Sequence, residues 1–301
     1  MTEPLFGQVL TAMVTPFDAA GNIDDAGVAG VVEHLLANGS DGIVVCGTTG
    51  ESPTLSHAEK LHLFKLVKDI VAGRGPVIAG TGGNDTAASI AITLEAAEIG
   101  VDGALLVVPP YNKPSQEGLY QHFIAIAQAV PGLKCMLYNV PGRTAQNMDA
   151  ATTVRLSYAA DNIVAVKEAS GNLVQAAEIY ANARPGFNIY SGDDGLALPM
   201  LAVGGVGVVS VSAHLVGKDM KQMHVSFANG ALEEAAKLNA KMLPIVKACF
   251  QPSTPSPAPV KAGMNLLGVP VGGLRLPLVE ANSAESEIVR KALVAYGLIS
   301  E

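Results

Sequence analysis

The chain has 301 residues, of which 49% are hydrophobic and 15% charged, a composition that excludes a disordered protein and allows one barrel-sized domain with a small addition. Its net charge of -8 and pI near 5.3 argue against nucleic-acid or anionic-membrane partners. An N-terminus without an apolar signal segment, together with three widely spaced cysteines, predicts a cytoplasmic protein with reduced thiols.

Eight short apolar runs alternate with helix-like segments, which is typical of a parallel α/β fold. The count of eight favours a closed (β/α)8 TIM barrel over a doubly wound open sheet, and no Gly-rich phosphate loop follows the first run. The runs are residues 9–14, 42–46, 77–80, 104–108, 135–140, 163–167, 188–192 and 207–212.

The segments between the runs have helical periodicity and end at glycines or turn residues. The pair Ser56 and Glu59 predicts a capping box at the start of a helix that runs to Gly73. The string G-x-D-G precedes a strand at 39–42 and again at 100–103, which indicates one type of loop used twice. The helical segments are 24–37, 56–73, 85–99 and 115–129.

The stretch 195–218, which has no charged side chain before Lys218, could be mistaken for a membrane span, but its glycines and serines favour a turn, a strand and the start of a helix. After about residue 230 the strand pattern stops, and a helix over 231–249, a Pro-rich loop and further helical pieces follow. We therefore predict a catalytic barrel over 1–229 and a small C-terminal α-helical domain over 230–301.

Lys167 is the most informative residue, because it ends an otherwise apolar predicted strand. Chemistry in TIM barrels sits at the C-terminal ends of the strands, and removal from water favours the neutral lysine amine that attacks a carbonyl. The alternative is a structural lysine paired with Glu168 or another carboxylate, because structural ion pairs also bury charge.

Other polar residues fall at predicted strand ends. Tyr138 could transfer protons there, or could be a core tyrosine with its hydroxyl at the rim. Thr48 and Thr49 lie between two glycines, where backbone N–H groups can bind a carboxylate, although an ordinary turn would have the same composition. Arg143 could bind a substrate carboxylate or lie on the surface, and the role of Tyr111 stays open.

Other chemistries have little support in the sequence. The six histidines show no pair with metal-ligand spacing, so we expect no metal site. There is no G-x-S-x-G, C-x-x-C or P-loop motif, and the Gly-rich strings lack the spacing of a dinucleotide fingerprint.

Several motifs together resemble the class I aldolase superfamily of dihydrodipicolinate synthase and N-acetylneuraminate lyase. They extend over nearly the whole chain in the order of that family, and Arg143 favours the synthase branch, since the sugar-acid lyases usually lack it. The motifs are GTTGES (47–52), VPPYNKPSQEGLYQHF (108–123), YNVPGRT (138–144), VAVKEASGN (164–172), SGDDG (191–195), GVVSVSAH (207–214) and LRLPL (274–278).

The resemblance implies a lyase that condenses pyruvate with L-aspartate 4-semialdehyde in lysine and diaminopimelate biosynthesis, through a pyruvate imine on Lys167 and with no metal or organic cofactor. Thr48 and Thr49 would bind the pyruvate carboxylate, and Thr49 would link Tyr138 to Tyr111 of a neighbouring subunit in a proton relay. The remaining implied roles are the aldehyde carboxylate for Arg143 and the pyruvate pocket for Gly192 and Val209.

The resemblance also implies a homotetramer, a dimer of dimers. Free lysine is expected to inhibit weakly or not at all, because Lys60, Ala88 and Pro110 stand where lysine-sensitive relatives have a histidine, a glutamate and a tyrosine. The competing functions are an aldolase of the same superfamily acting on a 2-keto-3-deoxy sugar acid, and a catalytically silent barrel that only binds a partner.

Overall fold

A computed structural model describes residues 4–301, so the first three residues of the N-terminal segment lie outside the described part. The chain divides into two compact units. The first combines the segment ending at Gln8 with Pro76–Val209, and the second combines Val9–Gly75 with Ser210–Glu301. The predicted domain boundary at residues 229 and 230 stays a prediction.

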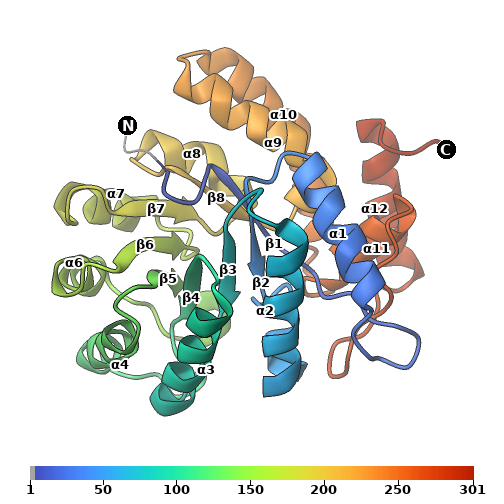
Figure 1. Cartoon of the computed structure of the whole chain (residues 1–301). Coiled ribbons are helices and arrows are strands. Elements are labelled where there is room, and N and C mark those ends of the chain that lie inside the picture. Colours follow the sequence, from blue (N-terminus) through green and yellow to red (C-terminus); the bar gives the residue numbers. More distant parts are fainter. Residues whose placement is uncertain (1–3) are drawn as a thin grey trace. The chain divides into compact units, whose positions relative to one another are not determined.

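The strands hydrogen-bond in chain order and close into a barrel of eight parallel strands, which confirms the predicted TIM barrel (Figure 1). Each of the eight apolar runs forms one of them. They are β1 (Val9–Ala12), β2 (Gly42–Val45), β3 (Val77–Gly80), β4 (Gly103–Val107), β5 (Lys134–Asn139), β6 (Ile163–Glu168), β7 (Asn188–Ser191) and β8 (Gly207–Ser210).

The strands are nearly continuous in Val, Ile, Leu and Ala because both of their faces are buried. In the first unit, α4, α6 and α7 follow one another along the outer side of β4, β5 and β6 (Figure 1). The helices of this unit are α3 (Thr86–Ile99), α4 (Gln116–Ala129), α5 (Pro141–Thr144), α6 (Ala150–Ala159), α7 (Leu173–Asn182) and α8 (Ala197–Ala202).

The second unit contains the helices near the chain's C-terminus. The capping box predicted at Ser56 and Glu59 is confirmed at the start of α2, and a second one at Asn282 and Glu285 opens α12. The helices are α1 (Asp25–Ala37), α2 (His57–Val71), α9 (Ala213–Ala228), α10 (Leu232–Cys249), α11 (Ala258–Leu266) and α12 (Ser283–Tyr296).

The repeated G-x-D-G string forms the same loop in both units. In the second unit, the Val9 N–H donates to the Asp41 carboxylate at 3.0 Å and the Asp41 N–H donates to the Val9 carbonyl at 2.7 Å. In the first unit, Asp102 makes the equivalent pair of bonds with Val77, both at 2.8 Å. Each aspartate stands just before one strand and binds the first residue of the strand before it. These bonds therefore fix the register between the two strands.

Two details differ from the sequence expectation. The segment before β8, expected to be a turn, contains a short helix, α8. Its residues Ala197, Leu198 and Met200 favour a helix, which ends before Gly204. The helix expected to reach Gly73 ends at Val71, where Ala72 adopts a left-handed conformation. Within residues 4–301, no helix has the length and hydrophobicity needed to cross a bilayer.

Candidate active site

Lys167 and Tyr138 lie side by side in neighbouring strands of the first unit. Lys167 is the fifth residue of β6 and pairs in register with Tyr138 of β5. Both side chains are 5% exposed, and the Lys167 Nζ lies 4.3 Å from the centroid of the Tyr138 ring. The structure thus brings the predicted amine and the predicted proton donor together in a largely water-free place.

The alternative of an ion pair between Lys167 and Glu168 finds no support. Successive strand residues point to opposite faces, so the two side chains diverge. The buried Glu168 carboxylate instead accepts hydrogen bonds from the Asn139 amide at 3.1 Å, the Gln175 amide at 3.0 Å and the Ser170 N–H at 2.7 Å. Among residues 4–301, Lys167 has no carboxylate partner, and its amine is left available for chemistry.

Asn139 and Gln175 bind Glu168 beside the candidate site, and the sequence did not point to either residue. The Asn139 amide also donates to the Asn147 side chain at 2.8 Å, and its carbonyl oxygen accepts from the Met148 N–H at 2.9 Å. These bonds hold Glu168 on the outer side of β6. The only available signal was the adjacent acid in the string K-E, which does not reveal its partners 29 and 7 residues away.

Gly192 and Val209, assigned to the pyruvate pocket by resemblance, are also in the first unit. Val209 is buried in β8, and Gly192 directly follows β7. A Cβ at Gly192 would lie 2.6 Å from the Ala169 Cβ and 3.0 Å from the Lys167 Cε. A glycine is needed there because a Cβ would overlap the Ala169 Cβ and press against the Lys167 side chain.

We therefore expect Gly192→Ala to lower kcat/KM by about tenfold or more, because overpacking costs about 1–3 kcal/mol and here it displaces Lys167 itself. Steady-state kinetics measure the effect. Gly132→Ala is the matched control, because a Cβ at Gly132 meets no atom within 4 Å. Unchanged kinetics in Gly192→Ala would show that the lysine does not need this space.

Arg143 and Tyr111 are both exposed residues of the first unit. Arg143 lies in the one-turn helix α5, directly after β5, and its guanidinium has no ion-pair partner among the described residues. Tyr111 is 90% exposed and has a φ of 72°, in the left-handed region that non-glycine residues rarely adopt. Both side chains are free to meet a ligand, and Tyr111 could equally meet another subunit.

Thr48 and Thr49 belong to a tight turn of the second unit. Cys46 and Glu51, with φ of 55° and 57°, border this turn in left-handed conformations. Within it, the Gly50 N–H donates to the Gly47 carbonyl at 3.1 Å, and the Glu51 N–H donates to the Thr48 carbonyl at 3.1 Å. Thr49 is buried and Thr48 half-buried. A compact turn of this kind can present backbone N–H groups to a carboxylate.

In the part of the chain that the structure describes, no group of three or more His, Cys, Asp or Glu side chains is arranged to hold a metal ion. Among the site residues expected from the sequence, the two that carry a positively ionisable group are the buried Lys167 and the exposed Arg143, both in the first unit. A closed parallel barrel with a buried lysine of this kind beside a tyrosine defines a class of enzyme, the Schiff-base-forming aldolases.

The chain belongs to the Dihydrodipicolinate synthetase family, whose model matches residues 5–296. A protein of Heliobacterium modesticaldum named 4-hydroxy-tetrahydrodipicolinate synthase is 54% identical over 293 residues, covering 97% of this chain and 96% of that protein. The structure of the synthase from Cyanidioschyzon merolae with lysine bound has a TM-score of 0.95 and 47% identity, over 98% of this chain and 99% of that one. The predicted family and enzyme class are confirmed.

A second similar structure bears on assembly. It is described as the first monomeric dihydrodipicolinate synthase variant, and it has a TM-score of 0.94 and 39% identity, with 98% of both chains covered. A variant of that protein therefore exists as a monomer.

Proposed function

We propose that this chain is a 4-hydroxy-tetrahydrodipicolinate synthase, which condenses pyruvate with L-aspartate 4-semialdehyde on the route to diaminopimelate and lysine. The observation that carries the proposal is the buried Lys167, in register with Tyr138 and without a carboxylate partner among residues 4–301. Family membership over residues 5–296 and relatives of that name at 50–54% identity support it.

The proposed chemistry begins when the neutral Lys167 amine attacks the pyruvate carbonyl and water leaves, which gives an imine. Loss of a proton from the methyl group gives an enamine, whose carbon attacks the aldehyde. The amino group of the second substrate then displaces Lys167 and closes the ring, so that the overall reaction releases one water. The protonated imine accepts the electron pair, so no metal or organic cofactor is required.

We assign the proton transfers to Tyr138, which lies against Lys167, and to Thr49 and Tyr111 by family resemblance. Thr48 and Thr49 would bind the pyruvate carboxylate, with Gly192 and Val209 lining the pocket around Lys167. Tyr111 would act in a neighbouring subunit of a homotetramer, and its 90% exposure supports a role outside its own chain. Cytoplasmic location is part of the proposal, supported by the buried thiols Cys46 and Cys135.

A coupled assay with pyruvate and L-aspartate 4-semialdehyde tests the proposal, and cleavage of 2-keto-3-deoxy sugar acids tests the competing aldolase. Arg143→Ala is expected to lower kcat/KM for the aldehyde about 10- to 150-fold, since a charge-assisted hydrogen bond is worth about 1.5–3 kcal/mol. Imine formation with pyruvate should change little.

The matched control is Arg155→Ala, which removes another exposed arginine of the first unit, one paired with Glu117. Faster turnover of a sugar acid than of the semialdehyde would contradict the proposed substrate. Equal losses toward both substrates in Arg143→Ala would mean that the arginine has a structural role.

A further inference from the structure

A fully buried ion pair lies next to the Thr48–Thr49 turn, in the second unit. The Lys261 Nζ is 2.7 Å from the Glu51 Oε1, and the two side chains are 1% and 0% exposed. The same ammonium donates to the Gly273 carbonyl at 2.6 Å and lies 4.4 Å from the centroid of the Phe17 ring. Removing two charges from water is unfavourable, so a buried pair is weak evidence for stability and calls for another role.

The second oxygen of Glu51 is bound by the LRLPL motif, to which the family resemblance gave no role. The Arg275 backbone N–H donates to the Glu51 Oε2 at 3.0 Å. The Arg275 guanidinium then donates to the Gly21 carbonyl at 2.8 Å and to the Thr54 carbonyl at 3.0 Å. Both carboxylate oxygens of Glu51 are thus held by the C-terminal segment, one by Lys261 and the other by the Arg275 backbone.

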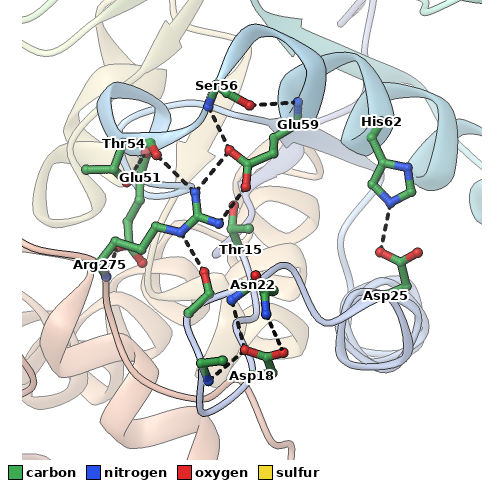
Figure 2. A network of polar contacts seen from close by, with 12 residues as sticks. Thr15, Asp18, Asn22, Asp25, Glu51, Thr54, Ser56, Glu59, His62 and Arg275 are labelled. Carbon is green, nitrogen blue, oxygen red and sulfur yellow. Dashed lines mark hydrogen bonds and ion pairs between the residues drawn. The ribbon is translucent and has the colours of Figure 1, made fainter.

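Arg275 also forms a two-pronged ion pair with Glu59, at 2.5 and 3.1 Å, while Glu59 closes the capping box with Ser56 (Figure 2). The hydrogen bond from Arg275 is the largest cause that lowers the pKa of Glu59, to about 2. Glu59 is therefore ionised at neutral pH. One arginine thus joins the two ends of the segment Glu51–Glu59 to each other and to the loop at Gly21.

These contacts act directly on the backbone of the turn. Glu51 is in a left-handed conformation, which persists in a non-glycine residue only when its surroundings fix it. Its N–H donates to the Thr48 carbonyl, and the Thr15 hydroxyl donates to the Gly50 carbonyl at 2.7 Å. A shift of the Glu51 side chain would therefore rotate the peptide groups beside Thr48 and Thr49.

We infer that Lys261, Glu51 and Arg275 are positioning residues: they hold the Thr48–Thr49 turn in the conformation that binds the pyruvate carboxylate. The C-terminal segment then sets the affinity for pyruvate without touching it. The inference rests on the proposed function for the identity of the ligand, whereas the network itself rests on contacts within the second unit.

The test is Arg275→Lys, which keeps the charge but loses the planar fork. We expect the KM for pyruvate to rise about ten- to hundredfold, because a misplacement of the order of an ångström can cost about a hundredfold. The KM for the aldehyde should change less than about twofold, because aldehyde binding does not depend on capture of the pyruvate carboxylate. The kcat should fall by a smaller factor than the KM for pyruvate rises, because Thr49 of the same turn is assigned to the proton transfers.

Arg74→Lys is the matched control. Arg74 forks onto Glu33 at 2.7 and 2.6 Å and also donates to the carbonyls of Ile70 and Val71, but it follows the opposite end of α2. The Arg74→Lys substitution should leave the KM for pyruvate unchanged. Equal changes in both KM values and kcat for Arg275→Lys, or none, would overturn the inference, as would a change confined to the unfolding temperature.

A second variant covers the case in which Arg275→Lys does not fold. The double substitution Lys261→Met with Glu51→Gln removes both buried charges with little change in shape, and it should show the same selective rise in the KM for pyruvate. A folded double variant with the wild-type KM for pyruvate would contradict the inference.

Borohydride trapping of pyruvate separates this inference from the proposed function, because it needs no aldehyde. If the wild-type chain traps no pyruvate, the proposed function fails and the inference with it. If the wild type traps pyruvate and Arg275→Lys reaches half-saturation at the same concentration, only the positioning inference fails.

Discussion

Lys167→Ala is expected to abolish the condensation, lowering kcat by about 10⁴-fold or more, since loss of the nucleophile removes the covalent pathway altogether. Borohydride with pyruvate should inactivate the unmodified chain by reducing the imine to a secondary amine. Peptide mass spectrometry should find the added pyruvate-derived mass on Lys167. The structural reason is that this buried amine has no carboxylate to neutralise it among residues 4–301.

Lys134→Ala is the control for this substitution. Lys134 is the first residue of β5, so it lies at the other end of the strand that carries Tyr138, and it is exposed. The Lys134→Ala variant should keep full activity and full labelling of Lys167 by pyruvate and borohydride. Labelling of another lysine, or residual condensation activity in Lys167→Ala above about 1% of the unmodified chain, would remove Lys167 from the mechanism.

The folded chain is expected to lose stability steeply as the pH falls from about 6.5 to 4. Burial lowers the pKa of His122 and of His214 to about 4, and burial also lowers the pKa of His224. His214, from the motif SAH, is held neutral because its Nδ1–H donates to the Val211 carbonyl at 2.7 Å and its Nε2 accepts from the Val14 N–H at 3.1 Å.

The direction follows from the proton balance. Between pH 6.5 and 4 these side chains bind protons in the unfolded chain but not in the folded one, so the free energy of unfolding falls as the pH falls. A difference of about 2.5 pKa units corresponds to about 3 kcal/mol each for His122 and His214. Together, the two contributions are a large fraction of the roughly 5–15 kcal/mol by which a typical domain is stable.

Denaturant unfolding at several pH values measures this slope. His122→Gln should flatten it by up to about 1.4 kcal/mol per pH unit, because one titrating group is lost. The substitution keeps a polar group that can bond the Thr86 hydroxyl, which is 2.9 Å from the His122 Nδ1. Gln128→Ala, at an exposed position of the same helix and without a titrating group, should leave the slope unchanged. An identical slope in His122→Gln would show that His122 does not titrate differently on folding.

The sequence by itself determined the strands and the barrel, and it singled out the candidate site residues. Each apolar run became a strand because buried parallel strands need continuous apolar side chains, which a short window of sequence reveals. The capping box at Ser56 and the paired G-x-D-G loops were also readable, since their hydrogen bonds join residues close in the chain or at a repeated spacing. Lys167 stood out because a lysine is out of place in an apolar run.

Only the tertiary structure decided which side chains meet. It set Lys167 in register with Tyr138, directed Glu168 away toward Asn139, and joined Glu51 to Lys261 across 210 residues. No local pattern encodes such pairs, because they depend on strand register and on the packing of segments that are distant in the chain. The conformation of a residue depends mainly on its close neighbours in the sequence. The partner of a buried charged side chain depends instead on how the whole chain folds.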